Sequence, residues 1–162
     1  MEMLTITLLW FAALSVGLMA GIYFTFSVFV MTALGSIDKA AGMAAMNAIN
    51  KVIVRTLFLP LFFASSASCL ALAVIGALAW GEPGAPAMAI GGTLYFTGMF
   101  LVTLARNVPL NNALAAADPD SAQGEQLWSD YLTSWTRWNH VRTVASTGSM
   151  GLLVLAISER AG

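Results

Sequence analysis

Four long apolar segments constrain the fold of this chain more than any other feature. They cover about residues 4–34, 52–80, 87–106 and 139–158, and crossing a bilayer takes about 20 apolar residues. Over the whole chain 59% of the residues are hydrophobic and 9% are charged, whereas soluble domains have roughly 45–50% and about 25%. The sequence therefore predicts an all-α integral membrane protein, a four-helix bundle that forms a single domain over residues 1–162.

The connections between the segments add detail to this fold. GEPGAP, at residues 81–86, is a turn so short that the second and third segments must be antiparallel neighbours. Residues 36–51 predict a short interfacial helix that Ser36 or Asp38 caps. One side of that helix carries Met43, Met46, Asn47 and Asn50. The connection between the third and fourth segments is also expected to be helical from near Ser121.

Proline and small residues modify the helices themselves. Pro60 predicts a kink in the second segment, and Pro109 predicts a kink or restart at the end of the third. Small side chains recur every four residues along the first two segments, which predicts close helix packing. They are Ala13, Gly17, Gly21 and Thr25, then Ser65, Cys69, Ala73 and Ala77.

Charge predicts how the chain lies in the membrane. The first segment follows Glu2 and not a lysine or arginine, and it outlasts a signal peptide, so we expect a retained and tilted span. Nearly all lysines and arginines lie in or beside the connections after the first and third segments. The positive-inside rule places these connections in the cytoplasm and both termini outside.

Several functional classes are disfavoured by composition. The net charge of −1 argues against a nucleic-acid partner. Cys69 is the single cysteine, so no disulfide or paired-thiol chemistry forms within one chain. One histidine, with no thiolate cluster and no paired carboxylates near the segments, predicts no metal site. The sequence contains neither a dinucleotide-binding fingerprint nor a nucleophile elbow.

The most informative stretch is WSDYLTSWTRWNHVRTVAS, at residues 128–146, which holds three of the five tryptophans and the only histidine. Where it enters the fourth segment, polar side chains cover about 160° of a helical wheel. An arc that wide cannot face lipid. The third segment ends in a second polar run, TLARNVPLNN, at residues 103–112. We therefore expect Asn139, His140 and Arg142 to face Asn107 and Asn111 across the mouth of the bundle.

Amide, guanidinium and aromatic groups gathered in one pocket suit a flat aromatic or amphiphilic ligand with oxygen substituents. Besides the five residues above, the expected contacts are Tyr23, Asn50, Arg106, Trp135 and Trp138. A structural alternative stays open. Boundary tryptophans commonly form an aromatic belt and boundary arginines reach toward lipid phosphates, and buried asparagines can satisfy one another without binding anything.

The runs NVPLNN, at residues 107–112, and WTRWNHVRT, at residues 135–143, together with four segments in a chain of this length, resemble the anthrone-oxygenase-like family of small membrane proteins. The resemblance extends over nearly the whole chain. It implies a four-helix membrane bundle and a monooxygenase activity that oxidises an anthrone to an anthraquinone with molecular oxygen, without a recognised metal or flavin.

That chemistry needs a base, donors for an enolate oxygen and a dry aromatic pocket. Under this hypothesis His140 is the base, while Asn107, Asn111 and Arg142 stabilise the enolate. Trp135, Trp138 and Tyr23 wall the ring system, and Asn139, Asn50 and Arg106 complete the substrate contacts. No cofactor is expected.

A second class of function stays open beside the oxygenase. The chain would then be a non-catalytic membrane protein that binds a quinone-like or lipid ligand, or a bundle that assembles with partners or with copies of itself. The nine methionines and the stripes of small residues fit such packing equally well.

Overall fold

The computed structural model describes residues 2–161, and over these residues the chain forms helices and no strands. The first long helix comprises α1 (Glu2–Thr25), the π-helical turn η1 (Phe26–Val30) and α2 (Met31–Ser36), and α3 follows it (Lys39–Ile53). The second comprises α4 alone (Phe58–Leu78). The third comprises α5 (Ala85–Tyr95), the π-helical segments η2 (Phe96–Leu101) and η3 (Thr103–Asn107), and α6 (Val108–Ala116). The fourth is α7 (Ala122–Ala161).

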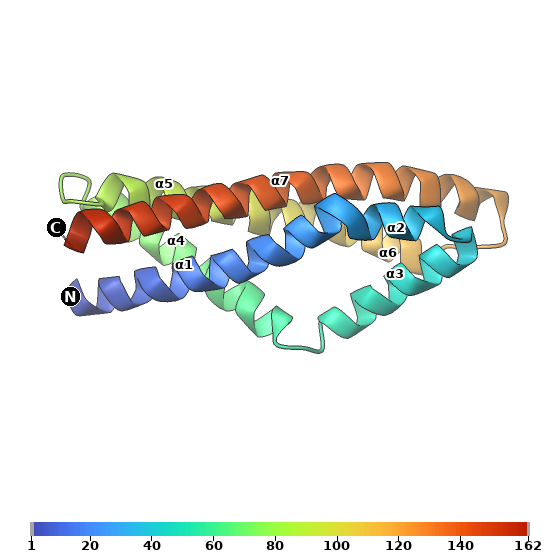
Figure 1. Ribbon diagram of the computed structural model, residues 1–162, viewed down its shortest axis with the longest axis horizontal. Coiled ribbons are helices and arrows are strands. Elements are labelled where there is room, and N and C mark those ends of the chain that lie inside the picture. The colour runs from blue at the N-terminus through green and yellow to red at the C-terminus, as the bar shows by residue number, and fades with distance from the viewer. Residues whose placement is uncertain (1, 162) are drawn as a thin grey trace.

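The helices form an elongated bundle in which α7 runs the full length (Figure 1). Both termini lie at one end, together with the α4–α5 turn, while α2, α3 and α6 lie at the other. Helix α7 packs on α1 and α5, and α4 packs on α5. Within residues 2–161, four helices are long and apolar enough to cross a membrane. The predicted fold class, a four-helix membrane bundle, is confirmed.

Helix α3 forms as predicted. Its N-cap is Asp38, whose Oδ1 accepts a hydrogen bond from the Ala41 backbone N–H at 3.1 Å. Met43 and Met46 on its inner face are buried against a cluster that includes Trp128 and Tyr131. The amphipathic helix α3 packs against the bundle because burying these two methionines removes apolar area from water.

Three helix bounds differ from the predicted segments. Helix α4 begins at Phe58 and not near residue 52, which places Pro60 in its first turn, where its missing N–H costs nothing, so no interior kink is needed. The third helix continues through Pro109 to Ala116, with the π-helical turn η3 directly before the proline. The connection before the fourth segment is helical, as expected, but it belongs to one continuous helix of 40 residues, α7.

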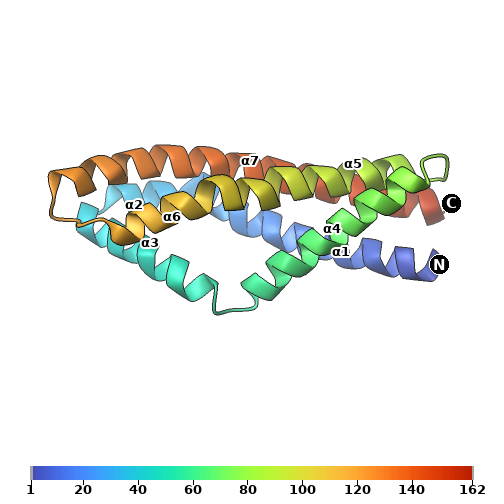
Figure 2. The ribbon, with the colours of Figure 1, turned by 180° about the vertical axis from the view of Figure 1, so that it is seen from behind.

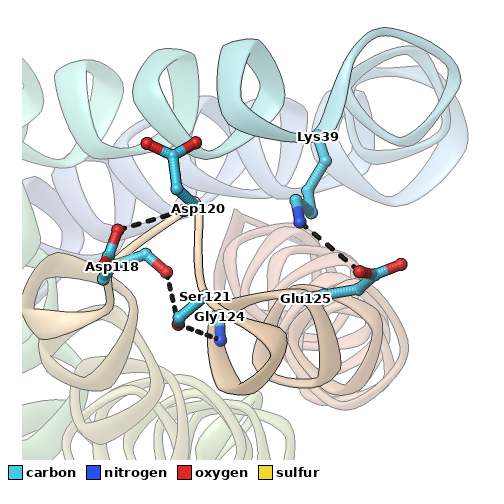
Figure 3. A network of polar contacts seen from close by, with 6 residues as sticks. All are labelled: Lys39, Asp118, Asp120, Ser121, Gly124 and Glu125. Atoms are coloured by element: carbon cyan, nitrogen blue, oxygen red, sulfur yellow. Dashed lines mark hydrogen bonds and ion pairs between the residues drawn. The ribbon is translucent and has the colours of Figure 1, made fainter.

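Two connections meet at the end of the bundle that is remote from the termini (Figure 3). Lys39 Nζ lies 3.5 Å from Glu125 Oε2, which links the start of α3 to the start of α7. Asp118 stabilises the turn before α7 by accepting two hydrogen bonds. Its carbonyl oxygen accepts one from Ser121 Oγ at 2.8 Å, and its Oδ1 accepts one from the Asp120 N–H at 3.0 Å. Asp118, Asp120 and Glu125 are exposed, as expected for solvated carboxylates.

Candidate functional site

A cavity of about 190 Å³ lies among the end of α1, the last turns of α3, the first turns of α4, the η3–α6 region and the middle of α7. Its apolar surface comes mainly from aliphatic and aromatic side chains of α1, α3 and α4. Its polar surface comes from Asn50, Thr103, Asn107, Asn111, Asn139 and Arg142. The cavity is thus bounded by all four long helices and by α3, so it exists only in the assembled bundle.

Arg142 is the most unusual group in this cavity. It is 5% exposed, and its guanidinium carbon lies 4.5 Å from the ring centroid of Tyr23 and 5.1 Å from that of Trp135. One terminal nitrogen donates to Asn139 Oδ1 at 2.7 Å and the other donates to Thr103 Oγ1 at 3.4 Å. Within residues 2–161 its Nε has no hydrogen-bond partner, and the only ion pair is the distant Lys39–Glu125 pair.

Arginine keeps its proton in proteins, so this guanidinium is a buried positive charge. A buried cation without a carboxylate is costly, because nothing replaces its lost hydration. The two aromatic faces and the two polar oxygens offset part of that cost. The remaining positive potential at the cavity favours a ligand that carries an anionic or strongly polarised oxygen.

Asn139 fixes the position of that charge. It is fully buried, and its Nδ2 donates to the Tyr23 carbonyl and to Ser27 Oγ, both at 2.7 Å. Ser27 lies in the π-helical turn η1, and its Oγ is 2.9 Å from Thr143 Oγ1. These contacts join α7 to the end of α1, while the Oδ1 of the same side chain receives Arg142. The orientation of the guanidinium therefore depends on the junction between α1 and α7.

The two asparagines of the third helix form the opposite wall. Asn107 is buried, and its Nδ2 donates to the Trp135 carbonyl at 3.2 Å, while its Oδ1 has no partner among the described residues. Asn111 Oδ1 accepts from Tyr131 Oη and from Trp135 Nε1, each at 2.8 Å. Asn107 ends the π-helical turn η3, and π-helical turns are frequent at functional sites because they displace side chains from the regular helical positions.

Helix α7 presents one inward row of residues to the cavity and to the aromatic cluster beside it. The rings of Trp128, Tyr131 and Trp135 stack with centroids 5.8 Å and 6.0 Å apart, and Phe26 lies 5.6 Å from Trp135. Asn139 and Arg142 continue the same row at spacings of four and three residues, as the helical period requires.

The structure brings seven of the ten predicted site residues to this cavity. They are Tyr23, Asn50, Asn107, Asn111, Trp135, Asn139 and Arg142. Asn139 and Arg142 thus line the same cavity as Asn107 and Asn111.

The expected position of His140 is wrong. His140 is exposed and does not line the cavity. It follows Asn139 on the helix, so it points about 100° away from that inward residue. Arg106 and Trp138 also lie outside: the Arg106 guanidinium carbon is 4.8 Å from the Trp138 ring centroid, and Arg106 is exposed.

Two residues that sequence reasoning did not assign to the site take part in it. Thr103 Oγ1 accepts a hydrogen bond from Arg142, and Tyr131 Oη donates one to the side-chain oxygen of Asn111. The sequence could have indicated both, because Thr103 is one helical turn before Asn107 and Tyr131 is one turn before Trp135, and residues at that spacing share a helix face. The sequence gives no such indication for the phenylalanines of α4, because every face of an apolar helix looks alike in the sequence. Three of them line the cavity: Phe58, Phe62 and Phe63.

Among residues 2–161, no three histidine, cysteine, aspartate or glutamate side chains converge as metal ligands would. In comparisons with known proteins, the family model described as Anthrone oxygenase matches residues 53–152. That range includes every polar residue of the cavity except Asn50. No curated protein and no solved structure matches the chain.

Proposed function

Because the chain belongs to the anthrone oxygenase family, we propose that it oxidises a polycyclic phenolic substrate of the anthrone type to a quinone with molecular oxygen. The observation that carries this proposal is Arg142, a buried guanidinium with a free Nε beside an amide wall. An anthrone bears a CH₂ group flanked by two aromatic rings and conjugated to the carbonyl. Loss of one of its protons gives an enolate, and Arg142 supplies the positive charge that such an oxyanion needs.

The reaction balances without a further reactant. The enolate transfers electrons to O₂, and recombination places a peroxide on the former CH₂ carbon. That carbon then loses its remaining proton as the O–O bond breaks, which leaves a second carbonyl and releases water. One oxygen atom enters the quinone and the other leaves as water, while the carbon is oxidised and O₂ is reduced.

The protein's part is to bind the substrate, hold its oxygen and exclude bulk water. Among the described residues, no histidine or carboxylate lines the cavity. We therefore assign removal of the first proton to water at the membrane surface, before the substrate enters the cavity, and stabilisation of the anion to the protein. Tyr23, Phe26 and Trp135 provide aromatic surfaces against which the ring system can pack. The cavity exceeds the ~150 Å³ apolar cavity that holds one benzene ring, and its open side leaves room for the remaining rings.

Oxygen uptake by the purified protein in lipid vesicles, over a panel of anthrones, tests the proposal. Uptake equal to the quinone formed is expected. Arg142→Met should lower turnover by about 10²–10³-fold, as removal of an oxyanion-hole donor does. It should still fold, because an unpaired buried charge disappears with the substitution. His140→Ala, two residues away on α7 and exposed, is the matched control and should leave turnover unchanged.

Uptake no faster than the buffer rate on every anthrone would overturn the oxidation. Binding of an anthraquinone without uptake would favour a non-catalytic, quinone-binding protein. If His140→Ala lost turnover and Arg142→Met kept it, the oxygenase could stand but the site would be misplaced.

A further inference from the structure

The side chains that line the cavity divide sharply by exposure. Every charged or amide side chain among them is buried or half-buried. The exposed ones are Val54, Phe63, Leu104 and Val108, which are between 37% and 53% exposed and are all apolar. A cavity that opened into water would be expected to have polar side chains at its rim, because exposed apolar rims are costly in water. This rim suits contact with hydrocarbon.

The position of α4 sets the depth of that rim. Helix α4 has 21 residues, so it extends about 31 Å at 1.5 Å per residue, which matches the ~30 Å hydrocarbon core of a bilayer. Its first residue, Phe58, therefore lies near one boundary of the hydrocarbon. Val54 precedes that boundary and Phe63 follows it, so the rim straddles the level at which acyl chains meet headgroups.

The corner between α3 and α4 extends the same surface. It projects away from the rest of the bundle in both views (Figures 1 and 2). Leu57 at this corner is 85% exposed and Val52 is 60% exposed; the exposed Lys51 precedes Val52, and the exposed Arg55 lies between the two. Apolar side chains interleaved with cations fit the hydrocarbon boundary, where acyl chains and anionic headgroup phosphates are neighbours.

From these observations we infer that the cavity opens sideways into the bilayer between the α3–α4 corner and the η3–α6 region, and that phospholipid covers this opening. The molecule that reaches Arg142 then comes from the membrane, with its oxygen-bearing end inward and its apolar part toward the acyl chains. The identity of that molecule rests on the proposed function, but the lipid contact at the rim does not.

Fluorescence quenching tests the lipid contact without any substrate. The native Cys69 is fully buried, so the unsubstituted protein serves as the unlabelled control. A bimane label on Leu57→Cys, in vesicles of phosphatidylcholine and phosphatidylglycerol, should lose fluorescence to lipids that carry a nitroxide high on the acyl chain and should resist aqueous iodide. A label on Ala41→Cys, exposed near the start of α3, should show the reverse.

Access to the cavity is tested with Ile49→Cys, a half-buried lining position on α3. A membrane-soluble maleimide should modify it in vesicles, and a charged, membrane-impermeant thiosulfonate should not. Quenching of the Leu57 label by iodide, or modification of Ile49→Cys by the charged reagent alone, would overturn the inference. Protection of the Leu57 label from both quenchers would also overturn it, since a second copy of the chain would then cover the corner. None of these outcomes depends on oxygen uptake.

Discussion

The side-chain oxygen of Asn111 holds two buried aromatic donors, Tyr131 Oη and Trp135 Nε1, each at 2.8 Å. Trp135 in turn contacts Arg142 through its ring and Asn107 through its carbonyl. The Asn111 oxygen therefore fixes the position of Trp135, and the Trp135 ring in turn contacts the Arg142 guanidinium. An unsatisfied donor in such surroundings costs far more than an average hydrogen bond contributes.

Asn111→Leu should consequently destabilise the protein by about 1–3 kcal/mol for each donor that it leaves unpaired. Unfolding in mild detergent with increasing denaturant, followed by tryptophan fluorescence, measures the change. Tyr131→Phe removes one of the donors, so Asn111→Leu should cost less in that background than in the unsubstituted protein. Equal costs in the two backgrounds would show that the Tyr131 hydrogen bond contributes nothing.

At the scale of elements, the close approach of α4 and α5 holds together the part of the bundle that spans the membrane. A Cβ added at Gly92 would overlap the Cys69 carbonyl oxygen and lie 2.8 Å from the Ala73 nitrogen. One added at Gly76 would lie 2.6 Å from the Ala85 carbonyl oxygen. Of the small-residue stripe predicted in the second segment, Ser65 and Cys69 are buried, and Cys69 and Ala73 meet Gly92 of α5, whereas Ala77 is exposed. Only the first part of the stripe is therefore an internal packing face.

Gly92→Ala should therefore destabilise the bundle by about 1–3 kcal/mol through overpacking against backbone that cannot move aside. Gly21→Ala is the matched control, because a Cβ at Gly21 meets nothing within 4 Å. That control should be neutral or slightly stabilising, since alanine favours a helix more than glycine does. Thermal unfolding in detergent, read by circular dichroism, separates the two variants, and an equal midpoint for both would contradict the close α4–α5 contact.

At the scale of the whole molecule, the bundle is longer than a bilayer is thick. Helix α7 has 40 residues and extends about 60 Å at 1.5 Å per residue, roughly twice the hydrocarbon thickness. The half that carries α4, α5 and the termini has the length and apolarity of a membrane domain. We place the other half, with α2, α3, α6 and the Lys39–Glu125 pair, outside the hydrocarbon, which puts the cavity at the junction of the two.

Positive charge predicts that the half outside the hydrocarbon is cytoplasmic. A membrane-impermeant thiol reagent should modify Ser129→Cys, exposed on α7 near its start, only in inside-out vesicles. It should modify Glu82→Cys, exposed in the α4–α5 turn at the other end, only in right-side-out vesicles. The opposite pattern would mean that the arginines near the cavity serve the site and do not report orientation.

Much of this architecture was predictable from the sequence, because the properties involved are local. The length and apolarity of four segments determine that they are helices of membrane length, and Asp38 is a detectable helix cap. Asn107, Asn139 and Arg142 are polar residues of apolar segments, and their placement inside the bundle follows from the cost of exposing such groups to lipid. The site's polar wall was therefore predictable before its geometry was known.

Tertiary structure decided the rest. A polar arc of about 160° contains both Asn139 and His140, and helical periodicity gives only the relative angles of side chains, not the direction that faces the neighbours. Contact with α1 turned Asn139 inward toward Tyr23 and Ser27 and left His140 exposed. The continuity of α7, the phenylalanines that α4 contributes and the apolar rim likewise depend on packing between helices far apart in the chain. These features cannot be predicted from a local sequence pattern, because they arise only where the helices meet.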